Sequence, residues 1–443
     1  MFGGDSLSPM KHFFLYLFLV LGSFACTVHR KAASVQGPPM DTLWTSAVLG
    51  PHHTGFALYD LGTGKPVYEY QADKYFTPAS NTKLFTFFAG LKTLGDSVEA
   101  LRYIVRNDSL IFWGTGDPTL LNLNYGGSRA IDFLKSRSET LVYWPGRFEQ
   151  DAWGSGWAWD DYNDYYQAEL SALPLYGNVV RFSGKQAGSL SYMPRFFELI
   201  PDLPGNRFSV RRDFMTNDFH ATAVPVAGGY EQDVPYRTSP ALTVKLLQEA
   251  TGKSVGTVQT FSSPAYQSLR SVPSDSLYKH MLQPSDNFMA EQILLLVASR
   301  LEQPLKSSTA IDYVLKNHLA DLPDKASWVD GSGLSRFNLF TPRDIIVLLT
   351  KILQTAPRER VFPLLAVGGK TGTIRNYFKT PDGEPYVFAK SGSLNGVYNL
   401  SGYLTTKSGK TFAFSFMNNN FVRPTSEIRR ETERILTAVH AQY

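Results

Sequence analysis

A serine and a lysine one helical turn apart have the strongest catalytic potential in this chain. Ser80 and Lys83 follow a proline and open an apolar run, 84–91, whose spacing predicts a helix. Three residues of separation place both side chains on the same helix face. A serine needs a base within hydrogen-bond reach to act as a nucleophile, and a partly desolvated lysine can lose its proton and serve. We therefore predict Ser80 as nucleophile and Lys83 as its base.

The spacing alone is weak support, because Ser-x-x-Lys also occurs by chance in a chain of this composition. Ser8 with Lys11 lies in the N-terminal leader, and Ser276 with Lys279 ends an ordinary amphipathic segment. Only the pair at 80 and 83 follows a proline turn and begins an apolar helix. The context therefore favours this pair.

Two further polar motifs lie downstream. Ser-Asp-Asn at 285–287 follows a proline and begins another helical apolar run, 288–297. Lys-Thr/Ser-Gly occurs twice, at 370–372 and at 390–392. Together with Ser-x-x-Lys, these motifs resemble the signature of class A β-lactamases and penicillin-binding proteins.

The spacing of the motifs resembles one branch of that group. Class A β-lactamases place Ser-Asp-Asn soon after the nucleophile, whereas here residues 84–284 intervene. The chain is similar to class C low-molecular-mass penicillin-binding proteins, which are D-Ala-D-Ala carboxypeptidases and endopeptidases with a large insertion at that place. Segments 114–120, 156–161, 171–173, 330–336, 338 and 341–342 resemble the same family. The resemblance implies action on peptidoglycan stem peptides and inhibition by β-lactam antibiotics.

The third motif has to lie on a strand at the rim of the site, where its backbone can pair with an extended peptide. Residues 370–372 follow two glycines and run into an irregular polar loop. Residues 390–392 follow the apolar run 386–389 and precede two strand-like runs joined by hairpin turns. We therefore assign the motif to Lys390, with Ser391 where threonine is usual in the family.

The resemblance implies a role for each residue of the first two motifs. Ser80 attacks the carbonyl carbon of the penultimate D-Ala, and Lys83 accepts the hydroxyl proton. Ser285 passes a proton to the leaving amine. Asn287 orients Lys83 and the substrate amide.

The third motif is expected to bind the substrate. Lys390 supplies positive charge for the terminal carboxylate and lowers the pKa of neighbouring groups. Ser391, Gly392 and Ser393 line the same position, where hydroxyl groups can bond the carboxylate. The backbone N–H groups of Ser80 and Ser393 are the expected oxyanion hole.

An aspartate pair beside a tryptophan is the remaining candidate for substrate recognition. In the family, an aspartate at this place contacts the free end of the diaminopimelate side chain. We assign the role to Asp161, with Asp160 as the alternative if the alignment slips by one residue, and a helix-capping or surface carboxylate as the rival interpretation. Six aromatic residues surround the pair and fit either carbohydrate stacking or packing of the insertion: Trp153, Trp157, Trp159, Tyr162, Tyr165 and Tyr166.

Composition indicates a folded globular protein with room for two or three domains. The chain has 443 residues, of which 43% are hydrophobic and 19% charged. A net charge of +4 with scattered basic residues does not favour nucleic-acid binding. The eight histidines show no ligand spacing, so we expect no metal and no cofactor.

The first residues resemble a secretory signal. Lys11 and His12 precede the apolar run 13–21, which is short for a transmembrane span. Cys26, the single cysteine, lies where a lipoprotein signal would be cut and acylated. We expect a periplasmic protein with a lipid anchor at Cys26, or an ordinary signal peptide with an incidental cysteine.

The remaining pattern predicts an α/β (α+β type) fold, in which an antiparallel sheet flanked by helices is split by a mostly β insertion. We expect a signal over 1–26, a transpeptidase-like domain over 27–96 and 271–443, and the insertion over 97–270. Helices are predicted at 41–49, 276–283, 286–301, 308–318, 342–354 and 425–440. Strands are predicted at 53–60, 66–70, 255–261, 398–405 and 411–417.

Two rival functions use the same motifs. A serine β-lactamase would need an additional carboxylate to hydrolyse the acyl-enzyme quickly, and the sequence identifies none. A weakly catalytic wall-binding or sensor protein is the rival from another class, which the complete set of motif residues disfavours. The sequence therefore favours a D-Ala-D-Ala carboxypeptidase and D,D-endopeptidase.

Overall fold

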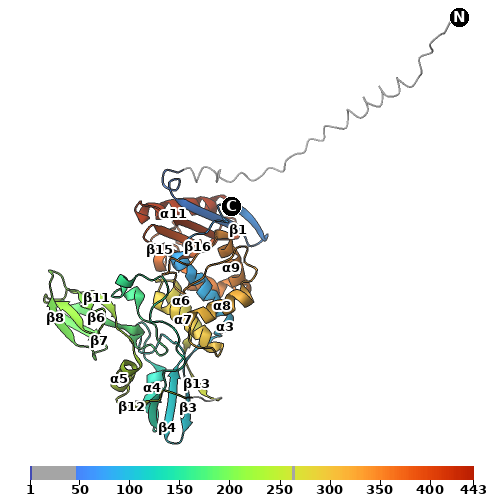
Figure 1. Ribbon diagram of the computed structural model, residues 1–443. Helices are drawn as coiled ribbons and strands as arrows, with labels where there is room; N and C mark the ends of the chain where they lie inside the picture. Colours follow the sequence, from blue (N-terminus) through green and yellow to red (C-terminus); the bar gives the residue numbers. More distant parts are fainter. Residues whose placement is uncertain (2–45, 262–264) are drawn as a thin grey trace. The chain divides into compact units, whose positions relative to one another are not determined.

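The computed structural model describes Met1, residues 46–261 and residues 265–443 (Figure 1). Apart from Met1, the predicted signal with Cys26 lies outside the described residues, as do residues 41–45 of the helix predicted at 41–49. Its described end, residues 46–49, forms a bend and a turn and not a helix. None of the helices in the described ranges is both long and apolar enough to cross a membrane. Residues Asp41–Tyr443 form one compact unit, described below.

A six-stranded antiparallel sheet forms the centre of this unit, in the order β14-β15-β16-β17-β1-β2. A two-residue turn, Asn395-Gly396, joins β15 to β16, and Gly396 has the positive φ of 71° that such a turn requires. The strands span His53–Asp60 (β1), Lys65–Tyr70 (β2), Ala366–Val367 (β14), Val387–Leu394 (β15), Val397–Thr405 (β16) and Thr411–Asn419 (β17).

Helices cover both faces of this sheet (Figure 1). Arg429 of α11 lies over the ring of Tyr398, whereas Tyr403, five residues along β16, donates a hydrogen bond to Leu349 of α9. An odd separation in a strand points side chains to opposite faces, so α11 and α9 lie on opposite sides. The helices are α3 (Lys83–Thr93), α6 (Ser274–Leu282), α7 (Asn287–Arg300), α8 (Ser307–His318), α9 (Pro342–Thr355), α10 (Arg358–Val361) and α11 (Thr425–Gln442).

The apolar run that follows Lys83 is buried between these helices. In α3 the side chains of Phe85 and Phe87 are fully buried, and the Phe85 ring stacks on Phe340 with centroids 4.0 Å apart. They share one core with α7, α8 and α9, where Ile293 and Leu348 are also fully buried. This core fixes the helix that starts at the predicted catalytic pair.

Residues between α3 and α6 form sheets of their own, with a separate hydrophobic core. The sheet orders are β12-β5-β4-β3-β13, β11-β6-β7 and β8-β10-β9. The strands and helices are β3 (Ser97–Arg106), β4 (Ser109–Gly114), α4 (Arg129–Ser136), β5 (Thr140–Tyr143), β6 (Val179–Gln186), β7 (Ser189–Met193), β8 (Leu199–Leu203), β9 (Val210–Arg212), β10 (Phe219–Thr222), β11 (Tyr230–Pro235), α5 (Pro240–Thr251), β12 (Val255–Thr257) and β13 (Gln267–Pro273).

The predicted fold class is confirmed, and the later helices begin and end within two residues of their predicted bounds. The strand predicted at 255–261 is wrong in length, because the strand in the structure covers only Val255–Thr257. Three residues suffice there because β12 is an edge strand, paired on one side with β5. The exact limits of the insertion, residues 97 and 270, stay a prediction.

We expect Phe85→Ala to lower the free energy of unfolding by about 3–5 kcal/mol, because the cavity left beside Phe340 cannot collapse between packed helices. Urea-induced unfolding followed by circular dichroism measures the change. Val422→Ala is the matched control, since that side chain is fully exposed and its removal should leave the unfolding midpoint unchanged. Equal stability of the two variants would contradict this account of the core.

Candidate active site

The local backbone presents Ser80 and Lys83 to each other. Ser80 lies in a 3-10 turn, Ala79–Thr82, and Lys83 is the first residue of α3. The Lys83 ammonium nitrogen lies 2.9 Å from the Ser80 hydroxyl oxygen. The lysine is therefore within direct hydrogen-bond reach of the predicted nucleophile.

Lys83 has no exposed surface, and its remaining donors are used inside the protein. It donates to the Asn287 amide oxygen at 2.7 Å and to the Ser332 carbonyl at 2.7 Å. Burial lowers the pKa of Lys83 to about 8, although the negative charges of Asp330 and Glu291 oppose the change. A lysine with that pKa is neutral in a substantial fraction of molecules near pH 7–8, so it can accept a proton.

The Ser-Asp-Asn motif places two side chains around this lysine. Asp286 caps helix α7 by accepting the Met289 N–H at 2.9 Å, and Ser285 before it has a positive φ of 72°. Asn287 holds Lys83 with its oxygen and donates from its amide nitrogen to the Tyr166 carbonyl at 3.1 Å. This cap holds the start of α7, so Ser285 and Asn287 lie on either side of Asp286 at the beginning of the helix.

Lys390 lies on β15 and contacts the second serine. Its ammonium nitrogen lies 2.7 Å from the Ser285 hydroxyl, and the side chain is fully buried. Burial and the nearby charge of Lys83 lower its pKa well below the usual value for lysine. Lys370, in contrast, is exposed in a turn after β14. The structure therefore brings Lys390, and not Lys370, to the group of predicted site residues.

The loop that precedes the third motif is attached to it. The Thr373 hydroxyl lies 2.6 Å from the Ser391 hydroxyl. Thr373 lies in a short 3-10 turn, Gly372–Ile374, in the segment before β15. Sequence reasoning gave Thr373 no role of its own.

Gly392 allows β15 to approach the turn that carries Ser80. A Cβ atom at this position would lie 2.5 Å from the Pro78 carbonyl oxygen and 2.9 Å from the Ser80 amide nitrogen. No side chain fits at these distances. The glycine of the third motif is therefore required for the strand and the nucleophile to lie side by side.

Two buried carboxylates support the site and were missed in the sequence. Glu291 accepts the backbone N–H groups of Gly331 and Ser332 at 2.9 and 2.7 Å, which fixes the Ser332 carbonyl that Lys83 contacts. Burial and the proximity of Asp330 raise the pKa of Glu291 to about 8. A charged residue within the apolar run of α7, four positions after Asn287 and so on the same helix face, was the available signal.

Asp330 organises the rest of the same loop. Its two oxygens accept four hydrogen bonds, from the backbone of Gly333 and Ser335, the Asn338 amide and the Trp157 indole. Trp157 belongs to the segment that carries the predicted aspartate pair. Asp330 therefore ties that segment to the catalytic loop.

Asp161 lies in a short 3-10 turn, Trp159–Asp161, close to Tyr166, whose hydroxyl donates to Asp164 at 3.2 Å. The Tyr166 carbonyl is the group that Asn287 contacts, so Tyr166 links the turn that carries Asp161 to the predicted site residues. Partial burial and the neighbouring charges of Asp164 and Asp160 raise its pKa. Asp160 is exposed in the same turn.

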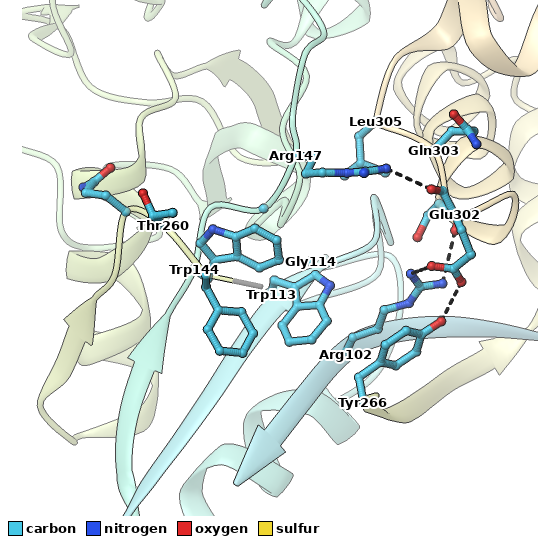
Figure 2. Close-up of a pocket in the computed structure, with 14 residues that line it drawn as sticks. Arg102, Trp113, Gly114, Trp144, Arg147, Thr260, Tyr266, Glu302, Gln303 and Leu305 are labelled. Atoms are coloured by element: carbon cyan, nitrogen blue, oxygen red, sulfur yellow. Dashed lines mark hydrogen bonds and ion pairs between the residues drawn. The ribbon is translucent and has the colours of Figure 1, made fainter. Parts of the chain in front are cut away.

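A cavity of about 500 Å³ lies apart from these residues, at the edge of the five-stranded sheet (Figure 2). None of the predicted site residues lines it.

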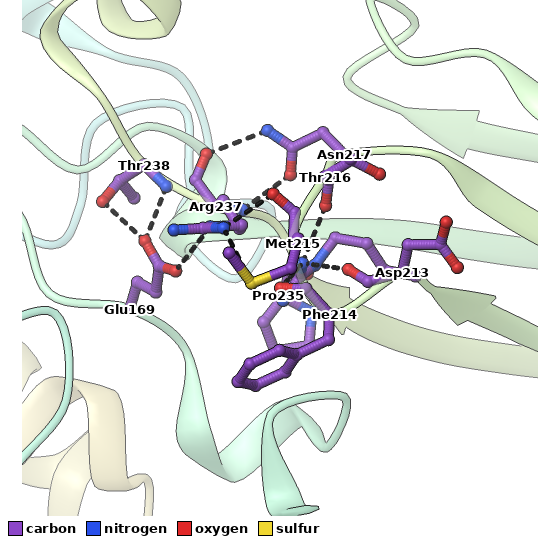
Figure 3. A network of polar contacts seen from close by, with 10 residues as sticks. Glu169, Asp213, Phe214, Met215, Thr216, Asn217, Pro235, Arg237 and Thr238 are labelled. Atoms are coloured by element: carbon purple, nitrogen blue, oxygen red, sulfur yellow. Dashed lines mark hydrogen bonds and ion pairs between the residues drawn. The ribbon is translucent and has the colours of Figure 1, made fainter. Parts of the chain in front are cut away.

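The aromatic residues around Asp161 are held by the loop between β9 and β10. The Phe214 ring lies against Trp153, Trp159 and Tyr162, with centroids 5.0–6.1 Å apart. Figure 3 shows the polar network behind this loop, in which Arg237 donates to the Met215 carbonyl at 2.6 Å. The contacts favour packing of the insertion as a role for this cluster.

A serine bonded to a buried lysine, with a second serine–lysine pair beside it, is suited to acyl transfer. On a sheet flanked by helices and split by an insertion, this site defines a penicillin-binding, serine-type peptidase. A model of the D-Ala-D-Ala carboxypeptidase 3 (S13) family matches residues 40–193 and 241–441. The chain belongs to this family of serine-type D-Ala-D-Ala carboxypeptidases, which confirms the resemblance stated from the motifs.

Individual relatives are similar to this chain over most of their length. The chain is 24% identical to D-alanyl-D-alanine carboxypeptidase DacB of Haemophilus influenzae, covering 94% of each chain. It is 26% identical to D-alanyl-D-alanine carboxypeptidase of Actinomadura sp., over 87% of this chain and 81% of that one. The crystal structure of penicillin binding protein 4 (dacB) from Haemophilus influenzae matches the fold with a TM-score of 0.72 at 20% identity, covering 91% and 99% of the two chains.

We expect Gly392→Ala to slow acylation by a labelled penicillin roughly 100-fold, because the added methyl group displaces β15 from Ser80. Rapid-quench labelling measures the rate constant, and a thermal melt reports the fold. Gly126→Ala is the matched control, since no atom lies within 4 Å of its added Cβ. Unchanged acylation in Gly392→Ala would show that this strand does not set the position of the nucleophile.

The pH dependence of acylation should report Lys83. A base with its pKa lowered to about 8 is mostly protonated below that pH, so the acylation rate should rise roughly tenfold per pH unit and level off above pH 8. Stopped-flow measurements across this range test the profile. In Lys83→Arg, whose guanidinium stays protonated, the rate should be low throughout. A flat wild-type profile would exclude Lys83 as the base.

Proposed function

We propose that the chain removes the terminal D-Ala from peptidoglycan stem peptides and cleaves D,D-cross-links, in both cases through an acyl-enzyme on Ser80. The observation that carries this proposal is the 2.9 Å contact between Ser80 and a fully buried lysine with a pKa near 8. The two activities share the acyl-enzyme and differ only in the leaving group, a single D-Ala or a neighbouring stem peptide.

In the first step, neutral Lys83 accepts the Ser80 proton as the hydroxyl oxygen attacks the penultimate carbonyl carbon. Charge develops on the carbonyl oxygen, and the N–H groups of Ser80 and Ser393 form the oxyanion hole. The close approach of Gly392 to the Ser80 amide supports this pairing. A donor of this kind is worth about 3–4 kcal/mol in the transition state.

The leaving amine then needs a proton, which Ser285 delivers. Its hydroxyl is bonded to Lys390, whose lowered pKa allows it to give up a proton and recover it. Asn287 keeps Lys83 in place and faces the substrate amide. The proton that Lys83 took from Ser80 replaces the one delivered to the amine, so Lys83 is neutral again. Water later attacks the ester carbonyl while Lys83 accepts a proton from that water, and Lys83 then passes this proton to the Ser80 oxygen as the ester bond breaks.

Recognition of the substrate falls to β15 and the aspartate pair. The terminal carboxylate binds at Lys390 and at the hydroxyl groups of Ser391 and Ser393, and the edge of β15 pairs with the peptide backbone. Asp161 contacts the free amine of the stem-peptide side chain. Its partly buried position beside Tyr166 supports this role.

A β-lactam presents a strained amide to the same groups and acylates Ser80. Rapid release of that product, as in a β-lactamase, would need a carboxylate free to activate water. Glu291 and Asp330 are buried, and backbone and side-chain donors occupy their oxygens. This arrangement favours a penicillin-inhibited peptidase.

Peptidoglycan lies outside the cytoplasm, so the enzyme acts there. The signal-like segment at 11–26 supports export to the periplasm, and acylation of Cys26 would anchor the mature chain to a membrane. We further propose domain limits at 27–96 and 271–443 around the insertion. The six-stranded sheet draws all of its strands from the first and last of these segments, which supports the division.

A fluorescent penicillin and a soluble D-Ala-D-Ala peptide test the proposal together. Ser80→Ala should abolish labelling and D-Ala release, and Lys390→Ala should reduce both at least 100-fold, because a buried positive charge is lost from the site. Lys370→Ala is the matched control and should behave as wild type, since that lysine is exposed. Labelling without D-Ala release would indicate a wall sensor, and the reverse lysine pattern would exclude the assignment of β15.

A further inference from the structure

The cavity in Figure 2 lies at one edge of the five-stranded sheet. Strands β4, β5 and β12 are neighbours and run parallel, so their carboxyl ends meet at the same edge. Trp113 lies near the end of β4, Trp144 follows β5, and residues 259–261 follow β12. The crevice outside the carboxyl ends of parallel strands is where α/β sheets bind ligands.

Aromatic rings form one wall of this cavity. Trp113 lies 5.3 Å from Trp144 and 5.8 Å from both Phe261 and Tyr266, measured between ring centroids. Trp113 is almost buried, whereas the other three rings are partly exposed. The buried ring supports the exposed ones, so the wall is a rigid aromatic platform.

The opposite wall combines Arg102 of β3 with the carboxyl end of α7 and the residues after that helix. Arg102 pairs with Glu99 and Glu302 at 2.8 and 3.0 Å, and its guanidinium lies 4.4 Å from the Tyr266 ring centroid. The Tyr266 hydroxyl donates to Glu302 at 2.6 Å. These contacts neutralise the buried charge and fix the orientation of Tyr266 (Figure 2).

Exposed polar groups at the rim are mostly uncharged. Gln259, Thr260 and Gln303 offer two amides and a hydroxyl, and Arg147 adds one cation that already donates to the Glu302 carbonyl at 2.8 Å. A site for phosphate or another anion would carry more cations at its rim than this cavity does. A ligand with apolar faces and hydroxyl or amide edges matches both walls, and N-acetylated sugar rings have this character.

We propose that this cavity, the Trp113–Trp144 cleft, binds the N-acetylated amino sugars of a glycan strand. Its volume of about 500 Å³ lies within the range of sites for small ligands. The inference rests on the proposed function, because the glycan is the polymer that carries the stem peptides.

The position of the cleft relative to the catalytic residues fits such a polymer. Helix α7 begins at Asn287, which contacts Lys83, and its other end lines the cleft. Its 14 residues span roughly 21 Å. An extended stem peptide of about five residues covers roughly 17 Å, a few ångström short of this span, so a glycan strand that extends beyond the cleft toward Asn287 can present a stem peptide to the site. Binding in the cleft would raise the local concentration of that peptide.

Titration of the full chain with short N-acetylglucosamine oligomers tests binding directly. Calorimetry should show saturable binding, and Trp144→Ala should weaken it roughly tenfold through loss of the exposed ring. Gln303→Ala, an exposed rim change that leaves the fold intact, should weaken it about threefold. Trp159→Ala, an exposed tryptophan beside Asp161, is the matched control and should bind as wild type. Absence of binding by the wild type, or loss in Trp159→Ala alone, would overturn the proposal.

A comparison of substrates separates this proposal from the peptidase function. Trp144→Ala should release D-Ala from a soluble pentapeptide at the wild-type rate and from intact peptidoglycan roughly tenfold more slowly. Equal rates of wild type and Trp144→Ala on intact peptidoglycan would overturn a role of the cleft in catalysis on the polymer. If the wild type releases D-Ala from neither substrate, the peptidase proposal fails, and the oligomer titration still decides whether the cleft binds glycan.

Discussion

Burial of the Lys83 ammonium group is the constraint on which the rest of the structure depends. A lysine in water keeps its proton at neutral pH, and only removal from solvent brings its pKa to about 8. Such burial is costly unless every donor is used. The site supplies three acceptors, from Ser80, Asn287 and the Ser332 backbone, and these lie on three separate chain segments. The fold therefore has to bring those segments together before the serine can be activated.

The supporting carboxylates follow from the same constraint. The Ser332 carbonyl can accept from Lys83 only if its loop is held rigidly, and Glu291 and Asp330 do so by accepting the loop's backbone N–H groups. The negative charge of Asp330 partly stabilises the protonated lysine, which keeps the pKa of Lys83 from falling further. Because the oxygens of both carboxylates are occupied, neither is free to activate water for a deacylation step.

Helix α7 connects the catalytic chemistry with the insertion. Its first turn presents Asn287, its middle carries Glu291, and the residues after its last turn line the Trp113–Trp144 cleft. The insertion reaches the site a second time through Trp157, which donates to Asp330, and through the Tyr166 carbonyl. A peptidase with this arrangement can bind both the stem peptide and the glycan strand that carries it, because one rigid helix sets the distance between the two binding sites.

The sequence by itself determined the family and the fold class and predicted the motif residues, because local patterns indicate helix starts, strand runs and the proline and glycine turns beside them. It also separated 390–392 from 370–372, since only the former lies in a strand pattern. It did not identify Glu291, Asp330 or Thr373 as parts of the site, nor the cleft, whose walls come from segments 102–147, 259–261 and 299–305 and from Tyr266. Only the tertiary structure decided these, because hydrogen bonding and burial depend on which distant segments pack together. The local spacing of residues does not show which segments those are.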